Sequence, residues 1–367
     1  MAAAFVNDDA MLLREVERAT RERRLAGLEG LVGGLAAVVV DVVPQDLLPA
    51  VGELLAATAL RHEASLDDPL TGDGGPCLWL RDGLGADFLV KSRPAGPDPF
   101  APYNAGAKTG PGRAGRLETF VYVCGDLDRY VAVQRGRGVA FMTETPAQTD
   151  AFSFIQTAPS VHTGNSLGFI EWKGRPGTFA HAKSRPLDLT PPPKPDRPWL
   201  ADIGGLDHVA TRVRAGNRDA AIAEFISLTG YHFDFAVYVE SLNSITSVAR
   251  LGPGEYAQVF TSGISPLDGA DGDAGPTERF IANYGTRPHH AAFAARGIEK
   301  VVEGLASDGV GFLSELVGSR QEGLKQIFSA MSPRTLLVNE YIERYDGFDG
   351  FFTKSNVTHL TRATEKQ

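Results

Sequence analysis

One structural unit recurs four times along this chain of 367 residues. Each copy is predicted to contain a strand, an amphipathic helix and then shorter strands, and the copies cover residues 35–92, 116–174, 205–262 and 288–344. A repeat of this kind cannot bury its apolar face alone, so neighbouring copies must pack together. We therefore expect an α+β protein of two domains, each made of two paired βαβββ units that form an open barrel.

A proline-rich segment separates the second unit from the third. It reads "DLTPPPKPDRPWL" at residues 188–200, and proline cannot lie inside a helix or a central strand. We interpret it as a stiff linker. The expected organisation is thus an N-terminal helix within 1–28, a first domain at 29–187 and a second domain at 201–367. A Gly/Asp-rich loop at 265–278 is inserted between units three and four.

Charge and composition exclude several classes of function. The formal net charge is −9, which repels nucleic acid and anionic membrane surfaces. The two cysteines, Cys77 and Cys124, lie in apolar, strand-like segments, so buried thiols are expected rather than a disulfide or a thiolate metal site. The N-terminus lacks an export signal and no apolar run is long enough to span a membrane. A cytoplasmic enzyme or binding protein is expected.

Side chains alternate between the two faces of a strand, and this rule selects the candidate site residues. His208 shares a face with Arg212 near the start of unit three. His290 falls at the corresponding place in unit four, on a face with the small residues Ala292 and Ala294. A lone histidine in a strand is usually a core residue, but two at the same repeat position indicate a shared site.

Pseudo-symmetry between the units would bring His208 and His290 together. Glu340 on the last strand would complete a face of two imidazoles and one carboxylate, the arrangement of non-haem Fe(II) oxygenases. Two rivals remain open at this point: His289 for His290, and Glu343 for Glu340. The small neighbours of His290 favour it, because a ligand pocket needs room.

Four motifs resemble those of a known family. "GLDHVATRV", "HHAAF", "LKQIF" and "NEYIER" resemble, in that order, the metal and substrate motifs of the 4-hydroxyphenylpyruvate dioxygenase and hydroxymandelate synthase family, within the vicinal oxygen chelate (glyoxalase fold) superfamily. The similarity covers roughly residues 200–366. The N-terminal half is similar in architecture only, which implies a first domain of the vicinal oxygen chelate fold without a metal and a catalytic second domain.

The resemblance assigns a role to individual residues. It implies that His208, His290 and Glu340 hold Fe(II) and that Gln326 is a catalytic residue beside the keto acid. The positions that it implies for substrate binding are Ser244, Ser262, Gln326, Phe328, Phe352 and Val357.

The chain also departs from the family pattern. Ser262 stands where an asparagine is expected, and Val357 stands where an aromatic residue is expected. The 50 residues from His290 to Glu340 form a shorter interval than the family usually has. These differences affect the walls of the pocket, so the resemblance supports the iron site better than it supports the substrate.

The implied activity is that of an Fe(II)-dependent dioxygenase. It would oxidatively decarboxylate a 2-oxo acid, either 4-hydroxyphenylpyruvate or a related aryl or alkyl pyruvate, and hydroxylate the same molecule with O₂. Two alternatives stay open: an extradiol ring-cleaving dioxygenase and a metal-free small-molecule-binding protein of the same fold. The oligomeric state is also open, with a homodimer as the assembly common in the family.

Overall fold

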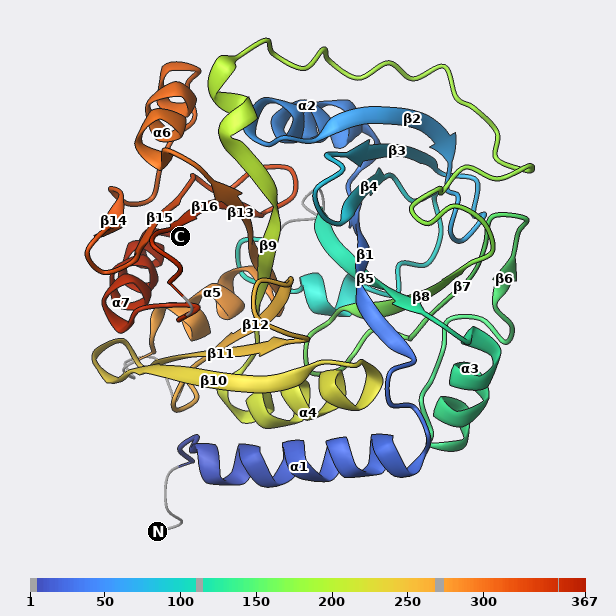
Figure 1. Ribbon diagram of the computed structural model, residues 1–367, viewed down its shortest axis with the longest axis horizontal. Helices are drawn as coiled ribbons and strands as arrows, with labels where there is room; N and C mark the ends of the chain where they lie inside the picture. Colours follow the sequence, from blue (N-terminus) through green and yellow to red (C-terminus); the bar gives the residue numbers. More distant parts are fainter. Residues whose placement is uncertain (1–4, 110–114, 268–273, 349) are drawn as a thin grey trace.

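Two curved sheets lie side by side and form the two halves of the molecule (Figure 1). The computed structural model describes residues 5–109, 115–267, 274–348 and 350–367. Within these ranges, each sheet has eight strands with the same connectivity, β2-β3-β4-β1-β5-β8-β7-β6 and β10-β11-β12-β9-β13-β16-β15-β14. The first strands of two units pair antiparallel at the centre of each sheet, β1 with β5 and β9 with β13. This arrangement confirms the expected α+β fold.

The bounds of the elements follow the four units. The N-terminal sheet consists of β1 Val32–Asp41, β2 Arg61–Asp67, β3 Pro76–Arg81, β4 Asp87–Lys91, β5 Arg116–Cys124, β6 Ala147–Gln148, β7 Phe152–Gln156 and β8 Ser166–Trp172. The C-terminal sheet consists of β9 Ile203–Arg212, β10 His232–Val239, β11 Ser244–Arg250, β12 Ala257–Ser262, β13 Arg287–Ala295, β14 Val317–Ser319, β15 Leu324–Phe328 and β16 Val338–Arg344. The α-helices are α1 Asp9–Leu25, α2 Leu47–Ala57, α3 Leu127–Gly136, α4 Arg218–Leu228, α5 Pro276–Tyr284, α6 Ile298–Ser307 and α7 Lys354–Ala363.

Several elements differ from the sequence expectation. The apolar pattern predicts no strand at 61–67 or 147–148, where the structure has β2 and β6, and it predicts a strand at 310–315, whereas the structure has β14 at Val317–Ser319. Part of the loop expected at 265–278 is the start of helix α5, because Pro276 occupies the first helical turn, where a missing N–H costs nothing. Residues 268–273 of that loop lie outside the described residues. No helix in the described ranges is long and apolar enough to cross a membrane.

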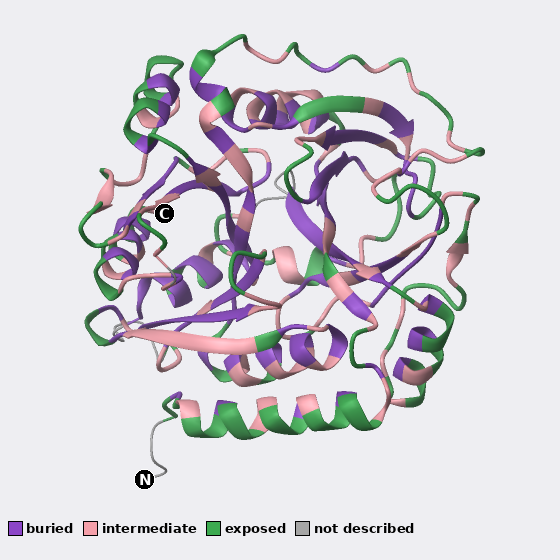
Figure 2. Cartoon of the chain, viewed as in Figure 1, coloured by how far each residue is buried: buried purple, intermediate pink, exposed green. Residues whose placement is uncertain are grey.

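One cluster of buried apolar side chains contains residues of both halves, and the strands where the two sheets meet are largely buried (Figure 2). Phe88 of β4 stacks on Phe293 of β13 with ring centroids 6.0 Å apart. Tyr122 of β5 contacts Phe225 of α4 edge to face. The hydroxyl of Tyr341 on β16 donates a hydrogen bond to the carbonyl oxygen at the end of α2. Aromatic side chains of each half therefore complete the core of the other.

A reciprocal pair of buried arginines joins the halves. Arg116 at the start of β5 donates to the carbonyl oxygen of Thr286 at 2.9 Å, and Arg287 at the start of β13 donates to that of Gly115 at 3.0 Å. Both guanidinium groups also donate to the side-chain oxygen of Asn104. The two contacts are related by the pseudo-symmetry of the halves. In each, the arginine donates to the carbonyl oxygen of the residue that precedes the other arginine.

Candidate metal centre

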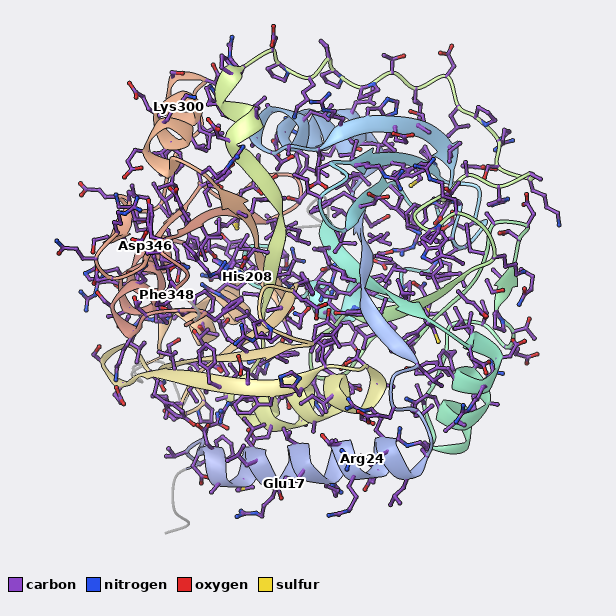
Figure 3. The ribbon with its side chains drawn as sticks, viewed as in Figure 1. Glu17, Arg24, His208, Lys300, Asp346 and Phe348 are labelled. Carbon is purple, nitrogen blue, oxygen red and sulfur yellow. The ribbon has the colours of Figure 1, made fainter. Side chains whose placement is uncertain are left out.

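Three side chains distant in sequence converge inside the C-terminal sheet, where Figure 3 labels His208. Ala292 of β13 lies between two of them, because it pairs with His208 of β9 on one side and with Glu340 of β16 on the other. Its methyl group leaves room between them. Glu340 Oε2 lies 3.1 Å from His208 Nε2 and 3.2 Å from His290 Nε2, so the structure brings together the three residues predicted as metal ligands.

His208 is held by a carboxylate on its other ring nitrogen. Its Nδ1 lies 2.8 Å from Asp207 Oδ1, and Arg344 donates two hydrogen bonds to the same carboxylate. Burial disfavours the imidazolium, but the charges of Glu340 and Asp207 outweigh burial and raise the pKa of His208 to about 9. At neutral pH both ring nitrogens of the metal-free histidine are therefore protonated, Nδ1 toward Asp207 and Nε2 toward Glu340. A metal at this position would replace the Nε2 proton and leave the Nδ1 proton in place. Sequence parity places Asp207 on the opposite face, so this partner was not predicted.

His290 is held by its neighbour His289. The two Nδ1 atoms are 2.8 Å apart, and His289 Nε2 lies 2.8 Å from the side-chain oxygen of Gln367. Burial keeps the pKa of His289 well below its usual value, so that ring is neutral. Since Nε2 of His289 donates to Gln367, its Nδ1 accepts the proton of His290 Nδ1. The Nε2 lone pair of His290 is then free for a metal.

The expectation that strand alternation separates His289 from His290 is wrong at this point of the sheet. The register of β13 against β9 shifts between Pro288 and His290, and such an irregularity re-aims side chains. Both rings therefore border the same cavity. The other rival, Glu343, faces away from it and accepts hydrogen bonds from the first backbone N–H groups of α6.

Glu340 is oriented by two amides. Gln326 of β15 donates from Nε2 to Glu340 Oε1 at 2.5 Å, and Asn356 of α7 donates from Nδ2 to Gln326 Oε1 at 2.9 Å. Gln326 is predicted to contact a keto acid. In the structure, one of its amide protons is bonded to the carboxylate of Glu340, a candidate metal ligand. Its other amide proton has no acceptor among the described residues. Asn356 was not predicted, because its contact depends on how the terminal helix packs.

The donor set fits a divalent transition metal. All three ligand atoms lie within 4.8 Å of one another and the residues are buried. An octahedral ion bound at about 2.1 Å separates adjacent donors by about 3 Å, close to the observed spacing. His208 Nε2 is buried without a well-aligned hydrogen bond in the described part of the chain, which is costly unless another partner binds it. Two imidazoles and one carboxylate on one face leave the opposite positions open.

The cavity beside the three residues contains most of the predicted substrate positions. The cavity has a volume of about 40 Å³, and its walls include Ser244, Gln326, Phe328, Phe352 and Val357. Ser262 is not part of these walls. Alternation along β12 points its neighbour Thr261 into the cavity instead.

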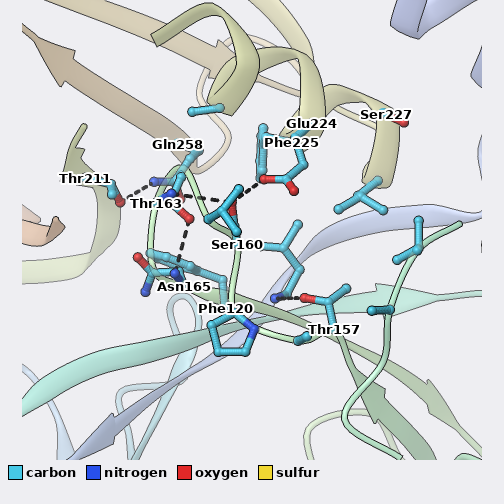
Figure 4. Close-up of a pocket in the computed structure, with 18 of the residues that line it drawn as sticks. Phe120, Thr157, Ser160, Thr163, Asn165, Thr211, Glu224, Phe225, Ser227 and Gln258 are labelled. Atoms are coloured by element: carbon cyan, nitrogen blue, oxygen red, sulfur yellow. Dashed lines mark hydrogen bonds between the residues drawn. The ribbon is translucent and has the colours of Figure 1, made fainter. Parts of the chain in front are cut away.

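A larger cavity lies between the two halves (Figure 4). It has about 300 Å³ of open space and is bordered by Phe120, Phe225 and Phe260. Its carboxylate, Glu224, already accepts a hydrogen bond from Ser160. No group of three possible metal ligands is found there among the described residues. The converging donor atoms therefore lie at the smaller cavity and not at this one.

The fold was compared with those of solved structures. A triple mutant of 4-hydroxymandelate synthase from Streptomyces coelicolor is similar, with a TM-score of 0.67 and 17% identity over 91% of this chain and 98% of that one. A fusion of a xylose isomerase-like TIM barrel with 4-hydroxyphenylpyruvate dioxygenase has a TM-score of 0.59 and 14% identity, over 92% of this chain and 53% of that one. No protein-family model and no curated protein sequence matches the chain.

The fold and the donor set define a two-domain protein of the vicinal oxygen chelate fold with a two-histidine, one-glutamate centre. Within this class, the chain shares the fold of 4-hydroxymandelate synthase over nine tenths of its length. The resemblance indicated by the four sequence motifs is thus confirmed at the level of the fold.

Proposed function

We propose that this chain is an Fe(II)-dependent dioxygenase that oxidatively decarboxylates a 2-oxo acid and hydroxylates the same molecule. The observation that carries the proposal is the convergence of His208, His290 and Glu340 beside a buried cavity. When bound, Fe(II) would supply coordination positions for the 2-oxo acid and O₂ and the electrons that activate O₂. The fold shared with 4-hydroxymandelate synthase supports the same reading.

The protein residues have distinct tasks in this proposal. Asp207 and His289 keep protons on the outer ring nitrogens of the two histidines, so that both Nε2 atoms face the centre. Gln326 orients Glu340 and offers its second amide proton to the oxygen atoms of a bound keto acid. Phe328 and Phe352 line the cavity and exclude water from it.

The ring-cleavage alternative requires a histidine that is free to exchange a proton with the substrate. His289 is the only further histidine lining the cavity within the described ranges. Both of its ring nitrogens already have partners, His290 and Gln367. This arrangement favours oxidation of a 2-oxo acid over cleavage of a catechol ring.

The test is anaerobic reconstitution with Fe(II), followed by oxygen-uptake measurements with a panel of 2-oxo acids and catechols. We expect uptake with a 2-oxo acid, together with a visible charge-transfer band when the acid is added without O₂. Glu340→Gln should lose both signals. Glu343→Gln, on the same strand but facing α6, is the matched control and should keep them.

Two results would contradict the proposal. Oxygen uptake with catechols alone would establish the ring-cleaving alternative. Failure of the wild-type protein to bind Fe(II), with binding of small molecules intact, would establish the metal-free alternative.

A further inference from the structure

A buried arginine in the wall of the candidate cavity has no acidic partner among the described residues. Arg212, the last residue of β9, is 4% exposed. No carboxylate in the described ranges forms an ion pair with it. Its guanidinium lies 4.4 Å from the ring centroid of Phe280 and donates one hydrogen bond to the carbonyl oxygen of Pro276. An arginine has five N–H donors, so most of its bonding capacity is unused by the described residues.

The charge on Arg212 is retained despite its burial. Loss of hydration lowers the pKa of the guanidinium to about 9, which still leaves it protonated at neutral pH. A buried charge without a counter-charge is strongly unfavourable. A bound anion would remove that penalty and use the free N–H donors.

Two threonines lie in register with Arg212 on the neighbouring strands. Thr261 of β12 pairs with Arg212, and Thr246 of β11 pairs with Thr261, so the three form one row across adjacent strands. All three line the cavity. The hydroxyl of Thr261 is buried without a hydrogen-bond partner within the described ranges. An arginine beside an unpartnered hydroxyl group is suited to a carboxylate, which accepts from both.

The row of Arg212, Thr261 and Thr246 is displaced from the three candidate ligands in the direction of the strands. Arg212 follows His208 by four residues, which is about 13 Å along a strand. Its side chain nonetheless borders the same cavity as His290 and Glu340. One small molecule can therefore contact the metal ligands at one end and Arg212 at the other.

We infer that the 2-oxo acid oxidised at this centre carries a second acidic group, and that Arg212, with Thr261, binds it. The inference rests on the proposed function and narrows its substrate class from aryl pyruvates to 2-oxo diacids. Arg212 is then a specificity-determining residue.

The test compares 2-oxo diacids of four to six carbons with 2-oxo monoacids of equal carbon number and with aryl pyruvates. Binding to the Fe(II)-loaded protein is measured by calorimetry without O₂, and oxygen uptake is measured separately. We expect diacids to bind best and Arg212→Met to weaken their binding by about 10- to 100-fold, the loss typical of one charged hydrogen-bonding partner. Monoacid binding should fall much less than diacid binding in this variant.

The matched control is Arg320→Met, which removes an exposed arginine paired with Asp346 and should leave every measurement unchanged. Equal affinity of diacids for the wild type and Arg212→Met, or a wild-type preference for aryl pyruvates, overturns the inference. Oxygen uptake with any 2-oxo acid still upholds the proposed function in that case. Conversely, Arg212-dependent diacid binding without oxygen uptake upholds the anion site and refutes the dioxygenase.

Discussion

The two halves of the molecule have the same sheet but use its concave face differently. His208 pairs with the first residue of β12, and Ala37 pairs with the first residue of β4, which fixes the correspondence between the halves. The pairing of β13 with β16 and the pairing of β5 with β8 identify the counterparts of His290 and Glu340 in the same way. The N-terminal counterparts of the three candidate ligands are Ala37, Thr119 and Gly168. None of these offers an imidazole or a carboxylate.

Neighbouring side chains fill the corresponding space in the N-terminal half. A Cβ atom at Gly168 would lie 2.8 Å from the ring of Phe154, so the ring takes the place of a glutamate side chain. The hydroxyl of Thr119 donates to Gln156 at 3.2 Å. The shared sheet therefore does not by itself make a metal centre. The side chains at the three corresponding positions decide whether donor atoms or packing groups meet.

The buried charges that line a cavity in each half show the same difference. In the N-terminal half, Lys91 lies 2.6 Å from Asp68, and Arg93 donates two hydrogen bonds to Glu118. These cations are neutralised by acids of their own half, beside a cavity of about 560 Å³. In the C-terminal half, Arg212 has no such partner among the described residues. We interpret the paired charges as structural and the unpaired charge as a ligand contact.

The largest effect should come from breaking the paired charges. Lys91→Met leaves Asp68 buried without its cation, which should lower the free energy of unfolding by about 3 to 5 kcal/mol. Denaturant titration of the metal-free protein measures this change. Lys300→Met removes an exposed pair with Asp202 and should change stability by less than about 1 kcal/mol. Equal stabilities of the two variants would contradict the comparison.

Metal affinity should distinguish the registered positions of the two halves. His208→Ala removes one of three donors and should weaken Fe(II) binding by about 100-fold or more, since loss of a group that merely supports a ligand already costs about 10- to 100-fold. Thr119→Ala, at the counterpart position of His290, should bind the metal like the wild type. Competition with a chelating dye provides the measurement, and a comparable loss in Thr119→Ala would refute the assignment.

A smaller effect is expected from the carboxylate that supports His208. Asp207→Asn keeps a hydrogen-bond acceptor near Nδ1 but removes the negative charge, so Fe(II) affinity should fall by about 10-fold. The same dye competition measures it. Asp202→Asn, a partly exposed acid near the start of β9, is the control. Unchanged affinity in Asp207→Asn would mean that this contact only stabilises the fold.

The smallest effect concerns pH and the N-terminal half. Burial, and then the charge of Glu118, raise the pKa of Asp41 to about 7. Because the folded-state pKa lies above the unfolded value, its contribution to stability is present at low pH and is lost as pH rises through about 7. The loss should be about 1.4 kcal/mol between pH 6 and 8. Unfolding curves of Asp41→Asn should lack this part of the pH dependence; identical slopes would exclude Asp41 as its source.

The fold and the converging residues were predictable where the signal is local. Alternation within a strand and repetition of the unit are properties of short segments, and they selected His208, His290 and Glu340. Strand β2 was missed because its residues are largely exposed and charged, as in "RHEASLD". Its pairing with β3 comes from the sheet rather than from apolar periodicity.

The supporting contacts were not predictable in the same way. The position of His289 depends on an irregularity between β9 and β13, and that of Asn356 depends on the packing of α7 against β15. Both are properties of tertiary structure. The role of Arg212 was equally hidden: its face was predicted, but the lack of an ion-pairing acid among the described residues becomes visible only in three dimensions.

The reciprocal arginine contacts have a consequence for how the chain could be divided. Arg116 and Arg287 each bond across to the other half, and one apolar core cluster contains side chains of both sheets. The covalent connection at residues 188–200 is therefore not what keeps the halves together. A gene split in that region should yield two polypeptides that reassemble without a peptide link, and neither is expected to be a self-sufficient catalyst.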